Sequence, residues 1–275
     1  IQDYFRNGSE YGVNLHYFVE DTPLGTAGSV KNAGKFLDET FVVISGDALT
    51  DINIRKAVSF HKEKKAIATL VLKRVKVPLE YGVVITGKDG SISRFVEKPN
   101  WGEVFSDTVN TGIYILEPEV LSYIKNGQKF DFSKDLFPML LDKGEPMYGY
   151  ITDEYWCDIG NLQTYLQAHF DMLSGKVKFQ LPAKKINSNV WIGKNVDIDS
   201  SVKLEGPCYI GDYTQIKKGA HIGAYTVIGN YNYIGPHTSI KRSVLWDHNN
   251  LGRCVEIRGA ALCNRIDIRE RVSIY

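Results

Sequence analysis

The feature that most constrains this chain is a six-residue period in its C-terminal third. An isoleucine or leucine occupies every sixth position, at Ile192, Ile198, Leu204, Ile210, Ile216, Ile222, Ile228, Ile234 and Ile240. The residues two positions earlier are mostly small or β-branched, and residues i and i−2 lie on the same face of a strand. Each hexad therefore predicts a short strand with two inward side chains, followed by a corner. Stacked coils of such hexads form a parallel β-helix.

The period is interrupted between Leu245 and Arg253, where Trp246 and Gly252 stand at the expected aliphatic positions. It resumes with a shifted phase at Leu262, Ile268 and Ile274. We predict that the interruption is a loop pushed out of one coil.

The residues before about position 178 alternate between strand-like and helix-like segments. Apolar runs predict strands over 41–45, 66–72, 81–86, 91–96 and 110–116. Helical spacing predicts helices over 29–37, 53–65, 117–124, 133–141 and 161–173. A turn signal at Lys88-Asp89-Gly90 predicts a hairpin between two of the strands. This alternation predicts an α/β layer with a mostly parallel sheet, so the expected domains are residues 1–178 and 186–275.

Charge and composition argue against several classes of protein. Lysine and arginine number 33 and aspartate and glutamate 32, so no basic field is present to hold a nucleic acid. No run approaches the roughly 18 apolar residues of a membrane span, so we expect no membrane insertion. The four cysteines show no CxxC spacing, which argues against a zinc site or a disulfide framework. We expect a reduced, cytoplasmic setting.

Two aspartates are candidates for a metal site. In open α/β sheets, ligands bind beyond the carboxyl ends of the strands. Asp47 comes shortly after the apolar run 41–44, and Asp158 lies among large apolar residues. Carboxylates from distant segments that meet at one pocket are what Mg²⁺-assisted phosphoryl chemistry requires. The alternative is that Asp47 begins a turn and Asp158 caps the helix predicted from Asn161.

Three other segments carry polar or small residues suited to a phosphorylated ligand. The small residues of the segment Leu24, Gly25, Thr26, Ala27 and Gly28 could expose backbone N–H groups to an anion or a nucleobase. Glu97 could accept sugar hydroxyls while Lys98 neutralises a phosphate. Asn110 and Thr111 could offer an amide and backbone groups to a hydroxylated ligand. Taken singly, an ordinary loop, a surface ion pair and a turn are equally compatible with these residues.

Six motifs occur in a characteristic order. They are EDTPLGTAG at 20–28, SGD at 45–47, YGVV at 81–84, FVEKP at 95–99, NTGIY at 110–114 and WCDIG at 156–160. In this order they resemble the nucleotidyltransferase family that acts on sugar 1-phosphates, especially mannose-1-phosphate guanylyltransferases with a hexapeptide-repeat tail. The resemblance implies a Rossmann-like α/β nucleotidyltransferase domain, incomplete at its N-terminus, followed by a left-handed parallel β-helix.

The resemblance also implies roles for the candidate residues. Asp47 and Asp158 would bind Mg²⁺ and, with Lys98, form the catalytic set, while the segment from Leu24 to Gly28 would bind the nucleotide. The sugar-phosphate site would consist of Gly82, Glu97, Lys98, Asn110 and Thr111. The implied reaction is attack by a sugar 1-phosphate on the α-phosphorus of a nucleoside triphosphate, releasing pyrophosphate. GTP and mannose 1-phosphate are the implied pair, with GDP-mannose as product.

One part of the family pattern does not occur in these residues. The glycine-rich G-x-G-T-R-L loop with a following lysine, which cradles the triphosphate in the family, is not found. The chain also begins with Ile1 rather than Met. We therefore expect a fragment of a longer protein, and we expect residues 1–275 alone to turn over negligibly. Robust pyrophosphate release by this chain would refute that expectation.

Two other functions remain open from the sequence. One is a non-catalytic regulatory or assembly subunit with a degenerate nucleotide site. The other is a hexapeptide-repeat acyltransferase that uses His221, His237 or His248 as a base. Because β-helix faces suit self-association, we also expect a homo-oligomer. The aromatic residues that could contribute are Trp191, Tyr209, Tyr213, Tyr225, Tyr231 and Tyr233.

Overall fold

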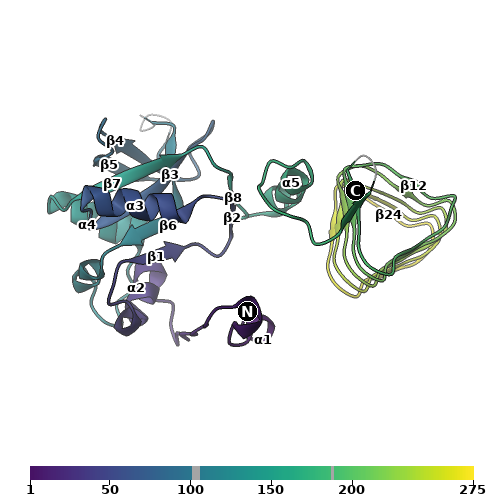
Figure 1. The fold of residues 1–275 in the computed structure, drawn as a ribbon, viewed down its shortest axis with the longest axis horizontal. Helices are drawn as coiled ribbons and strands as arrows, with labels where there is room; N and C mark the ends of the chain where they lie inside the picture. Colours follow the sequence, from purple (N-terminus) through teal and green to yellow (C-terminus); the bar gives the residue numbers. More distant parts are fainter. Residues whose placement is uncertain (101–105, 187–188) are drawn as a thin grey trace. The chain divides into compact units, whose positions relative to one another are not determined.

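The computed structural model describes residues 1–100, 106–186 and 189–275, and Figure 1 shows its fold. The chain divides into two compact units. The first consists of Ile1–Gly46 and Asn53–Asp153, and the second of Asp47–Ile52 and Glu154–Tyr275. The domain boundary expected between residues 178 and 186 does not coincide with this division, because these residues lie within the second unit. The expected boundary between functional domains stays a prediction.

The first unit is built on one mixed sheet with the strand order β5-β4-β6-β3-β7, and β1 pairs with β6. The strands are β1 (Phe41–Ile44), β3 (Ala68–Arg74), β4 (Gly82–Thr86), β5 (Ile92–Glu97), β6 (Thr108–Leu116) and β7 (Met147–Thr152). The α/β class is confirmed. Among the described strands of this sheet, only β3 and β7 pair in parallel, whereas β1, β3 and β4 are antiparallel to β6. The expected mostly parallel sheet is corrected to a mixed one. Parallel neighbours need a long crossover connection, and β4 and β5 are instead joined by the predicted hairpin.

The described helices of the first unit are short. They are α1 (Gln2–Phe5), η1 (Ser9–Tyr11), α2 (Gly25–Asn32), η2 (Gly34–Phe36), α3 (Ile54–Lys64), η4 (Pro118–Tyr123), η5 (Phe132–Leu136) and α4 (Phe137–Asp142). The predicted helix over 53–65 is confirmed as α3, whose cap Asn53 accepts the N–H of Lys56. The sheet core is apolar, with Leu70, Leu116 and Phe137 fully buried. No helix in the described ranges is both long enough and apolar enough to cross a membrane.

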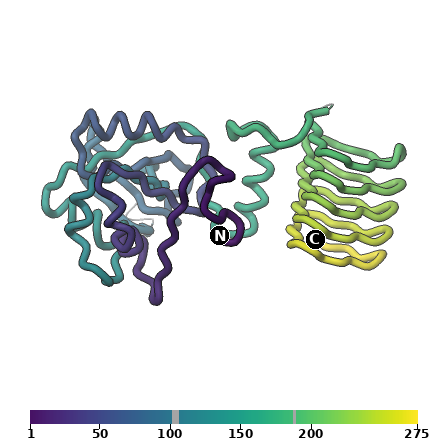
Figure 2. The backbone as a smooth tube through the Cα atoms, turned by 60° about the horizontal axis from the view of Figure 1, so that its bottom comes forward, coloured from purple at the N-terminus to yellow at the C-terminus, as the bar shows by residue number. Residues whose placement is uncertain are grey.

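The second unit contains a two-stranded ribbon, one helix and a β-helix. The ribbon consists of β2 (Ala48–Thr50) and β8 (Trp156–Asp158), and the helix is α5 (Leu162–Leu173). Three sheets form the sides of the β-helix, with successive coils stacked on one another (Figures 1 and 2).

Each side of the β-helix is a ladder of very short strands. The first side is β9 (Lys184–Ile186), β10 (Val190–Ile192), β13 (Cys208–Ile210), β16 (Thr226–Ile228), β19 (Val244–Leu245) and β22 (Ala261–Leu262). The second is β11 (Asp197–Ile198), β14 (Gln215–Ile216), β17 (Tyr233–Ile234), β20 (Asn250–Leu251) and β23 (Asp267–Ile268). The third is β12 (Lys203–Leu204), β15 (His221–Ile222), β18 (Ser239–Lys241), β21 (Glu256–Arg258) and β24 (Ser273–Ile274).

The aliphatic ladder fills the β-helix as the period predicts. Five successive members, Ile210, Ile216, Ile222, Ile228 and Ile234, are fully buried. The coils approach so closely at the corners that a Cβ on Gly211 would lie 2.6 Å from the backbone of Gly229. The sequence-based prediction of a hexapeptide-repeat β-helix is therefore confirmed.

The predicted looped-out segment near Trp246 is wrong. In the first coils, partners are 18 residues apart, as Ile210 is from Ile228. From Ile228 onward they are 17 residues apart, so Ile228 pairs with Leu245 and Ile240 with Ile257. One corner of each later coil is thus one residue shorter, which shifts the phase of the repeat without a loop. Trp246 is consequently a partly exposed corner residue.

Helix α5 packs against one side of the β-helix. Leu166 and Phe170 form a buried cluster with Val244. The ring of Phe170 lies 5.4 Å from that of Tyr225, and the Tyr165 hydroxyl accepts a 2.6 Å hydrogen bond from the indole N–H of Trp246. Because Tyr225 contacts Phe170 within this unit, we no longer propose it as a residue for self-association.

Candidate active site

The predicted sugar-phosphate residues converge at one end of the sheet in the first unit. Gly82 at the start of β4 pairs directly with Glu97 at the end of β5. On the other side of β4, Val83 pairs with Val109, which precedes Asn110 on β6. Strand register therefore places Gly82, Glu97 and Asn110 on three neighbouring strands at the same sheet end.

Gly82 leaves room for the carboxylate of Glu97. A Cβ at Gly82 would lie only 2.7 Å from Glu97 Oε2. Glu97 is half-buried, and this burial raises the pKa of its carboxyl group. Asp131 raises that pKa further, while Lys98 and Lys134 oppose the shift. The site thus holds a half-buried carboxyl group whose oxygens can accept hydrogen bonds from hydroxyl groups.

Lys98 occupies a strained backbone conformation. Its φ is +47°, in the left-handed region that non-glycine residues rarely adopt, and its N–H donates to the Tyr81 carbonyl at 3.1 Å. The following Pro99 is buried, whereas Lys98 itself is exposed. Such strain persists where the surrounding structure fixes it, and it is common at functional positions.

Asn110 is held by three hydrogen bonds. Its amide nitrogen donates to the Tyr114 hydroxyl at 2.9 Å and to Ser133 Oγ at 3.3 Å. Its amide oxygen accepts the N–H of Gly112 at 3.1 Å. Tyr114 is buried, which raises its pKa to about 12 and keeps the hydroxyl neutral. The Asn110 side chain is therefore oriented before any ligand arrives.

Thr111 differs from its neighbour in the predicted site. It is 2% exposed, and its hydroxyl donates to the Val71 carbonyl at 2.8 Å. Because residues alternate between the faces of a strand, Thr111 points into the sheet core where Asn110 does not. Its side chain stabilises the sheet, and we leave it out of the proposed sugar-phosphate site.

The glycine-rich segment 24–28 begins helix α2. The N–H groups of Ala27 and Gly28 both donate to the Phe130 carbonyl, at 3.0 and 2.9 Å. The expectation that these two groups face a ligand is therefore wrong. A Cβ on Gly25 would lie 2.7 Å from the Phe130 carbonyl oxygen, so the small residues allow close packing against the chain there. Leu24, Gly25 and Thr26 are not fully buried.

Asp131 lies beside the candidate site and was not singled out by the sequence analysis. It accepts the hydroxyl of Thr26 at 2.9 Å, and its other oxygen accepts the N–H groups of Ser133 and Lys134 at the start of η5. Since Ser133 contacts Asn110, this network joins segment 24–28 to the sheet end. The available sequence signal was an acidic helix cap, Asp131, directly before the helical segment.

In the second unit, the ribbon brings the two predicted metal ligands together. Ala48 on β2 pairs with Asp158 on β8, and the N–H of Ile159 donates to the Asp47 carbonyl at 2.9 Å. Asp47 lies in an exposed turn, and Asp158 is half-buried. The alternative role for Asp158 as a helix cap is wrong, because Asn161 caps α5 in a reciprocal pair with Thr164.

The donor set at this ribbon suits one kind of cation. In the described ranges, no group of three or more His, Cys, Asp or Glu side chains could hold a metal. Two aspartates at adjacent backbone positions of the ribbon, without a third acidic group, do not make an all-protein metal cage. They fit Mg²⁺, which commonly takes one or two carboxylates and completes its shell with water and substrate phosphates.

Comparison with known proteins gives the family. The model of the nucleotidyl transferase family matches residues 1–175, and that of the bacterial transferase hexapeptide repeat matches residues 207–242. The chain belongs to the sugar-1-phosphate nucleotidyltransferase family. The expected fold, a nucleotidyltransferase α/β domain followed by a left-handed hexapeptide-repeat β-helix, is thereby confirmed.

Individual relatives of this nucleotidyltransferase carry different substrate names. A UTP–glucose-1-phosphate uridylyltransferase of Synechocystis is 39% identical over 95% of this chain and 75% of its own length. A mannose-1-phosphate guanylyltransferase of Mycobacterium tuberculosis is 33% identical over 62% of this chain. The match covers 48% of that relative, so this chain spans about half of its length. Among solved structures, a putative glucose-1-phosphate thymidylyltransferase from Bacillus anthracis aligns with a TM-score of 0.56 and 26% identity, covering 66% of this chain and 73% of that one.

Proposed function

We propose that the protein containing these residues forms a nucleotide sugar and pyrophosphate from a nucleoside triphosphate and a sugar 1-phosphate. The observation that carries the proposal is the register of β5, β4 and β6, which groups Gly82, Glu97 and Asn110 at one sheet end beside Lys98. In this role Glu97 and Asn110 hydrogen-bond the sugar, and Lys98 neutralises its phosphate.

The chemistry needs no nucleophile from the protein. A phosphate oxygen of the sugar 1-phosphate attacks the α-phosphorus, the bond from that phosphorus to the bridging oxygen breaks, and pyrophosphate leaves. The residues contribute by positioning the substrates and by balancing negative charge. Asp47 and Asp158 are the residues that would hold Mg²⁺, which when bound offsets charge on the phosphates. Lys98 binds the attacking phosphate of the sugar 1-phosphate, and residues 24–26 bind the nucleotide.

For the substrate pair we favour UTP and glucose 1-phosphate. The uridylyltransferase from Synechocystis is 39% identical across 95% of this chain, including the β-helix. GTP and mannose 1-phosphate, the pair implied by the family resemblance, are the second candidate. Guanylyltransferase relatives from M. tuberculosis and Debaryomyces hansenii support that pair at 33% and 35% identity over 62% and 71% of the chain.

Calorimetric titration with the two product nucleotide sugars tests the proposal. In the presence of Mg²⁺, UDP-glucose should bind at least about tenfold more tightly than GDP-mannose, a difference of about 1.4 kcal/mol. Tighter binding of GDP-mannose would reverse the substrate assignment. A regulatory subunit with a degenerate site would bind a nucleotide sugar equally well without Mg²⁺. Failure to bind either compound would overturn the proposed function.

Glu97→Gln should weaken ligand binding without destabilising the protein. Because burial raises the pKa of Glu97, the folded protein binds this proton more tightly than the unfolded chain does. Stability contributed by this group therefore falls as the pH rises from the ordinary value of 4.5 through the raised pKa. At pH 7 the variant should melt no lower than the wild type. Its affinity for glucose 1-phosphate should fall about tenfold, because a hydrogen bond to a charged acceptor is lost.

The control for this variant is Glu63→Gln, because Glu63 is an exposed glutamate on α3. It should leave both the pH dependence of the melting temperature and the affinity unchanged. Unchanged glucose 1-phosphate affinity in Glu97→Gln would remove Glu97 from the proposed site.

We also propose that the protein self-associates through its β-helix. Tyr213, Tyr231 and His248 form a stack at one corner, with ring centroids 5.0 and 4.9 Å apart. Tyr213 and Tyr231 are 45% and 51% exposed, and exposed aromatic residues are enriched at interfaces between subunits. Sedimentation velocity should show an oligomer that Tyr231→Ser weakens. A monomeric wild type, or an oligomer unaffected by this substitution, would contradict the assignment.

A further inference from the structure

The ribbon that carries the acidic pair needs an anchor. Strands β2 and β8 pair with each other and with no other strand in the described ranges. An isolated two-stranded ribbon is at best marginally stable in water. Asp47 directly precedes β2 and Asp158 ends β8, so both lie at the same end of the ribbon. Their spacing depends on whatever fixes this ribbon in place.

The opposite end of the ribbon is closed around Tyr155. The N–H of Tyr155 donates to Asp51 Oδ1 at 2.8 Å, and the N–H of Asp51 donates to the Tyr155 carbonyl at 3.2 Å. The Thr50 hydroxyl donates to the same carbonyl at 2.8 Å. The second oxygen of Asp51 accepts the N–H of Lys178 at 2.8 Å. The backbone of Tyr155 is therefore fixed at this end of the ribbon.

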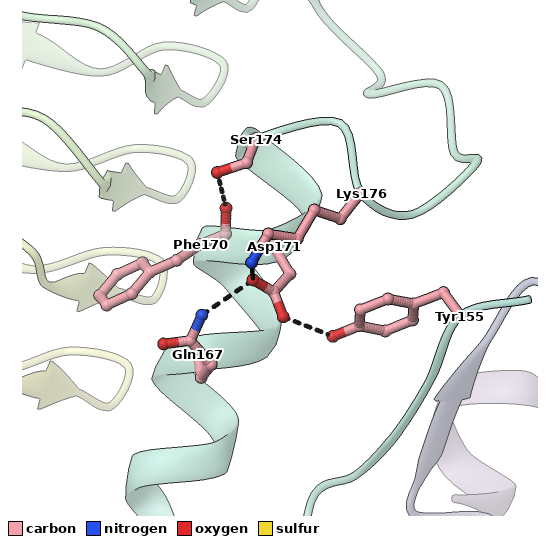
Figure 3. A network of polar contacts seen from close by, with 6 residues as sticks. All are labelled: Tyr155, Gln167, Phe170, Asp171, Ser174 and Lys176. Carbon is pink, nitrogen blue, oxygen red and sulfur yellow. Dashed lines mark hydrogen bonds and ion pairs between the residues drawn. The ribbon is translucent and has the colours of Figure 1, made fainter. Parts of the chain in front are cut away.

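That side chain reaches a buried carboxylate on helix α5 (Figure 3). The Tyr155 hydroxyl donates to Asp171 Oδ2 at 3.0 Å, and Asp171 is only 8% exposed. The other oxygen of Asp171 accepts from Gln167 Nε2 and Lys176 Nζ, each at 2.8 Å. Burial is the largest cause that raises the pKa of Tyr155, and the nearby Cys157 and Asp171 raise it further. The hydroxyl therefore remains a donor at neutral pH.

Helix α5 is capped at its N-terminus and packed against the β-helix, so its position is well fixed. Its N-terminus is capped reciprocally by Asn161 and Thr164. Leu166 and Phe170 on α5 are buried in a cluster with Val244 of the β-helix. A hydrogen bond from the ribbon to Asp171 therefore connects the ribbon to a packed element rather than to a mobile loop.

We propose that Tyr155 and Asp171 are positioning residues for the acidic pair, because their hydrogen bond holds the ribbon that presents Asp47 and Asp158 to a divalent cation. Neither residue contacts the cation or the substrates. The inference rests on the proposed function, since it requires these two aspartates to be metal ligands. Loss of the bond loosens the ribbon and weakens cation binding without removing a ligand.

Titration of the whole chain with Mn²⁺ alone, followed by electron paramagnetic resonance, tests this role. Tyr155→Phe removes only the hydroxyl and should lower the Mn²⁺ affinity by about fivefold to tenfold, near the lower range for residues that orient metal ligands. Gln167→Met is the matched control, because it removes one hydrogen bond to the other oxygen of Asp171 and leaves the Tyr155 bond in place. It should keep the Mn²⁺ affinity within about twofold of the wild type.

Melting temperatures of the same proteins separate positioning from general destabilisation. If the Mn²⁺ affinity of both variants simply follows their melting temperatures, the positioning role is refuted. The Mn²⁺ affinity of Asp158→Asn shows which proposal has failed, the metal site or the positioning role. If Asp158→Asn binds Mn²⁺ like the wild type, the proposed metal site fails, and the inference fails with it. If Asp158→Asn loses Mn²⁺ and Tyr155→Phe does not, the positioning inference alone is overturned.

Discussion

Asp158→Asn is expected to abolish the Mg²⁺ dependence of nucleotide-sugar binding. Asp158 and Asp47 occupy adjacent positions at one end of the β2–β8 ribbon, and we propose that they share one cation. Replacing one of two carboxylates by an amide removes half of the protein's charge at that site. Substitutions of residues that merely orient metal ligands cost 10–100-fold in affinity, so loss of a ligand should cost at least about a hundredfold. Titrations of UDP-glucose with and without Mg²⁺ measure the difference.

Asp153→Asn provides the matched control for this substitution. Asp153 is exposed, lies five positions before Asp158 in the sequence and belongs to neither strand of the ribbon. The change removes the same charge and should leave the Mg²⁺ effect intact. If Asp153→Asn and Asp158→Asn behave alike, long-range charge rather than metal ligation explains the effect.

Ile222→Ala should produce a large loss of stability, because Ile222 is a central member of the aliphatic ladder. Ile222 is fully buried and stacks between Leu204 and Ile240 of the neighbouring coils. Truncating a buried isoleucine to alanine costs about 2–5 kcal/mol, because apolar contacts are lost and a cavity is left. In a solenoid, each coil is stabilised by its neighbours, so a defect in a central coil weakens two interfaces. Urea unfolding monitored by circular dichroism measures the change in free energy.

Ile274→Ala makes the same chemical change in β24, the last strand that the structure describes. Ile274 is only partly buried and pairs with Ile257 on one side. Its free energy of unfolding should fall by less than half as much as that of Ile222→Ala. Equal losses at the two positions would contradict the view that stacking on both sides stabilises the ladder.

The β-helix could be predicted because one local rule repeats. Every coil places an aliphatic side chain at the same inward position, so sequence spacing translates directly into structure. The phase shift after Ile240 misled this reasoning, because a corner shortened by one residue and an inserted loop change the spacing in similar ways. Strand pairings such as that of Ile228 with Leu245 distinguish them.

The candidate sites depend on contacts that sequence spacing does not encode. The hairpin signal predicted that β4 and β5 would pair, and the observed register of that pair places Gly82 opposite Glu97. The engagement of the Ala27 and Gly28 N–H groups by Phe130 depends on a segment about a hundred residues away, as does the contact of Thr26 with Asp131. The ribbon that joins Asp47 to Asp158 is likewise a long-range pairing of very short strands, which have too few residues to show a period.

The most direct test of the central claim is a crystal structure of the protein with Mn²⁺ and UDP-glucose, using the anomalous scattering of manganese. We expect one strong anomalous peak within bonding distance of a carboxylate oxygen of both Asp47 and Asp158, with phosphate oxygens completing the shell. Manganese bound elsewhere, with these two carboxylates engaged only by protein groups, would contradict the account.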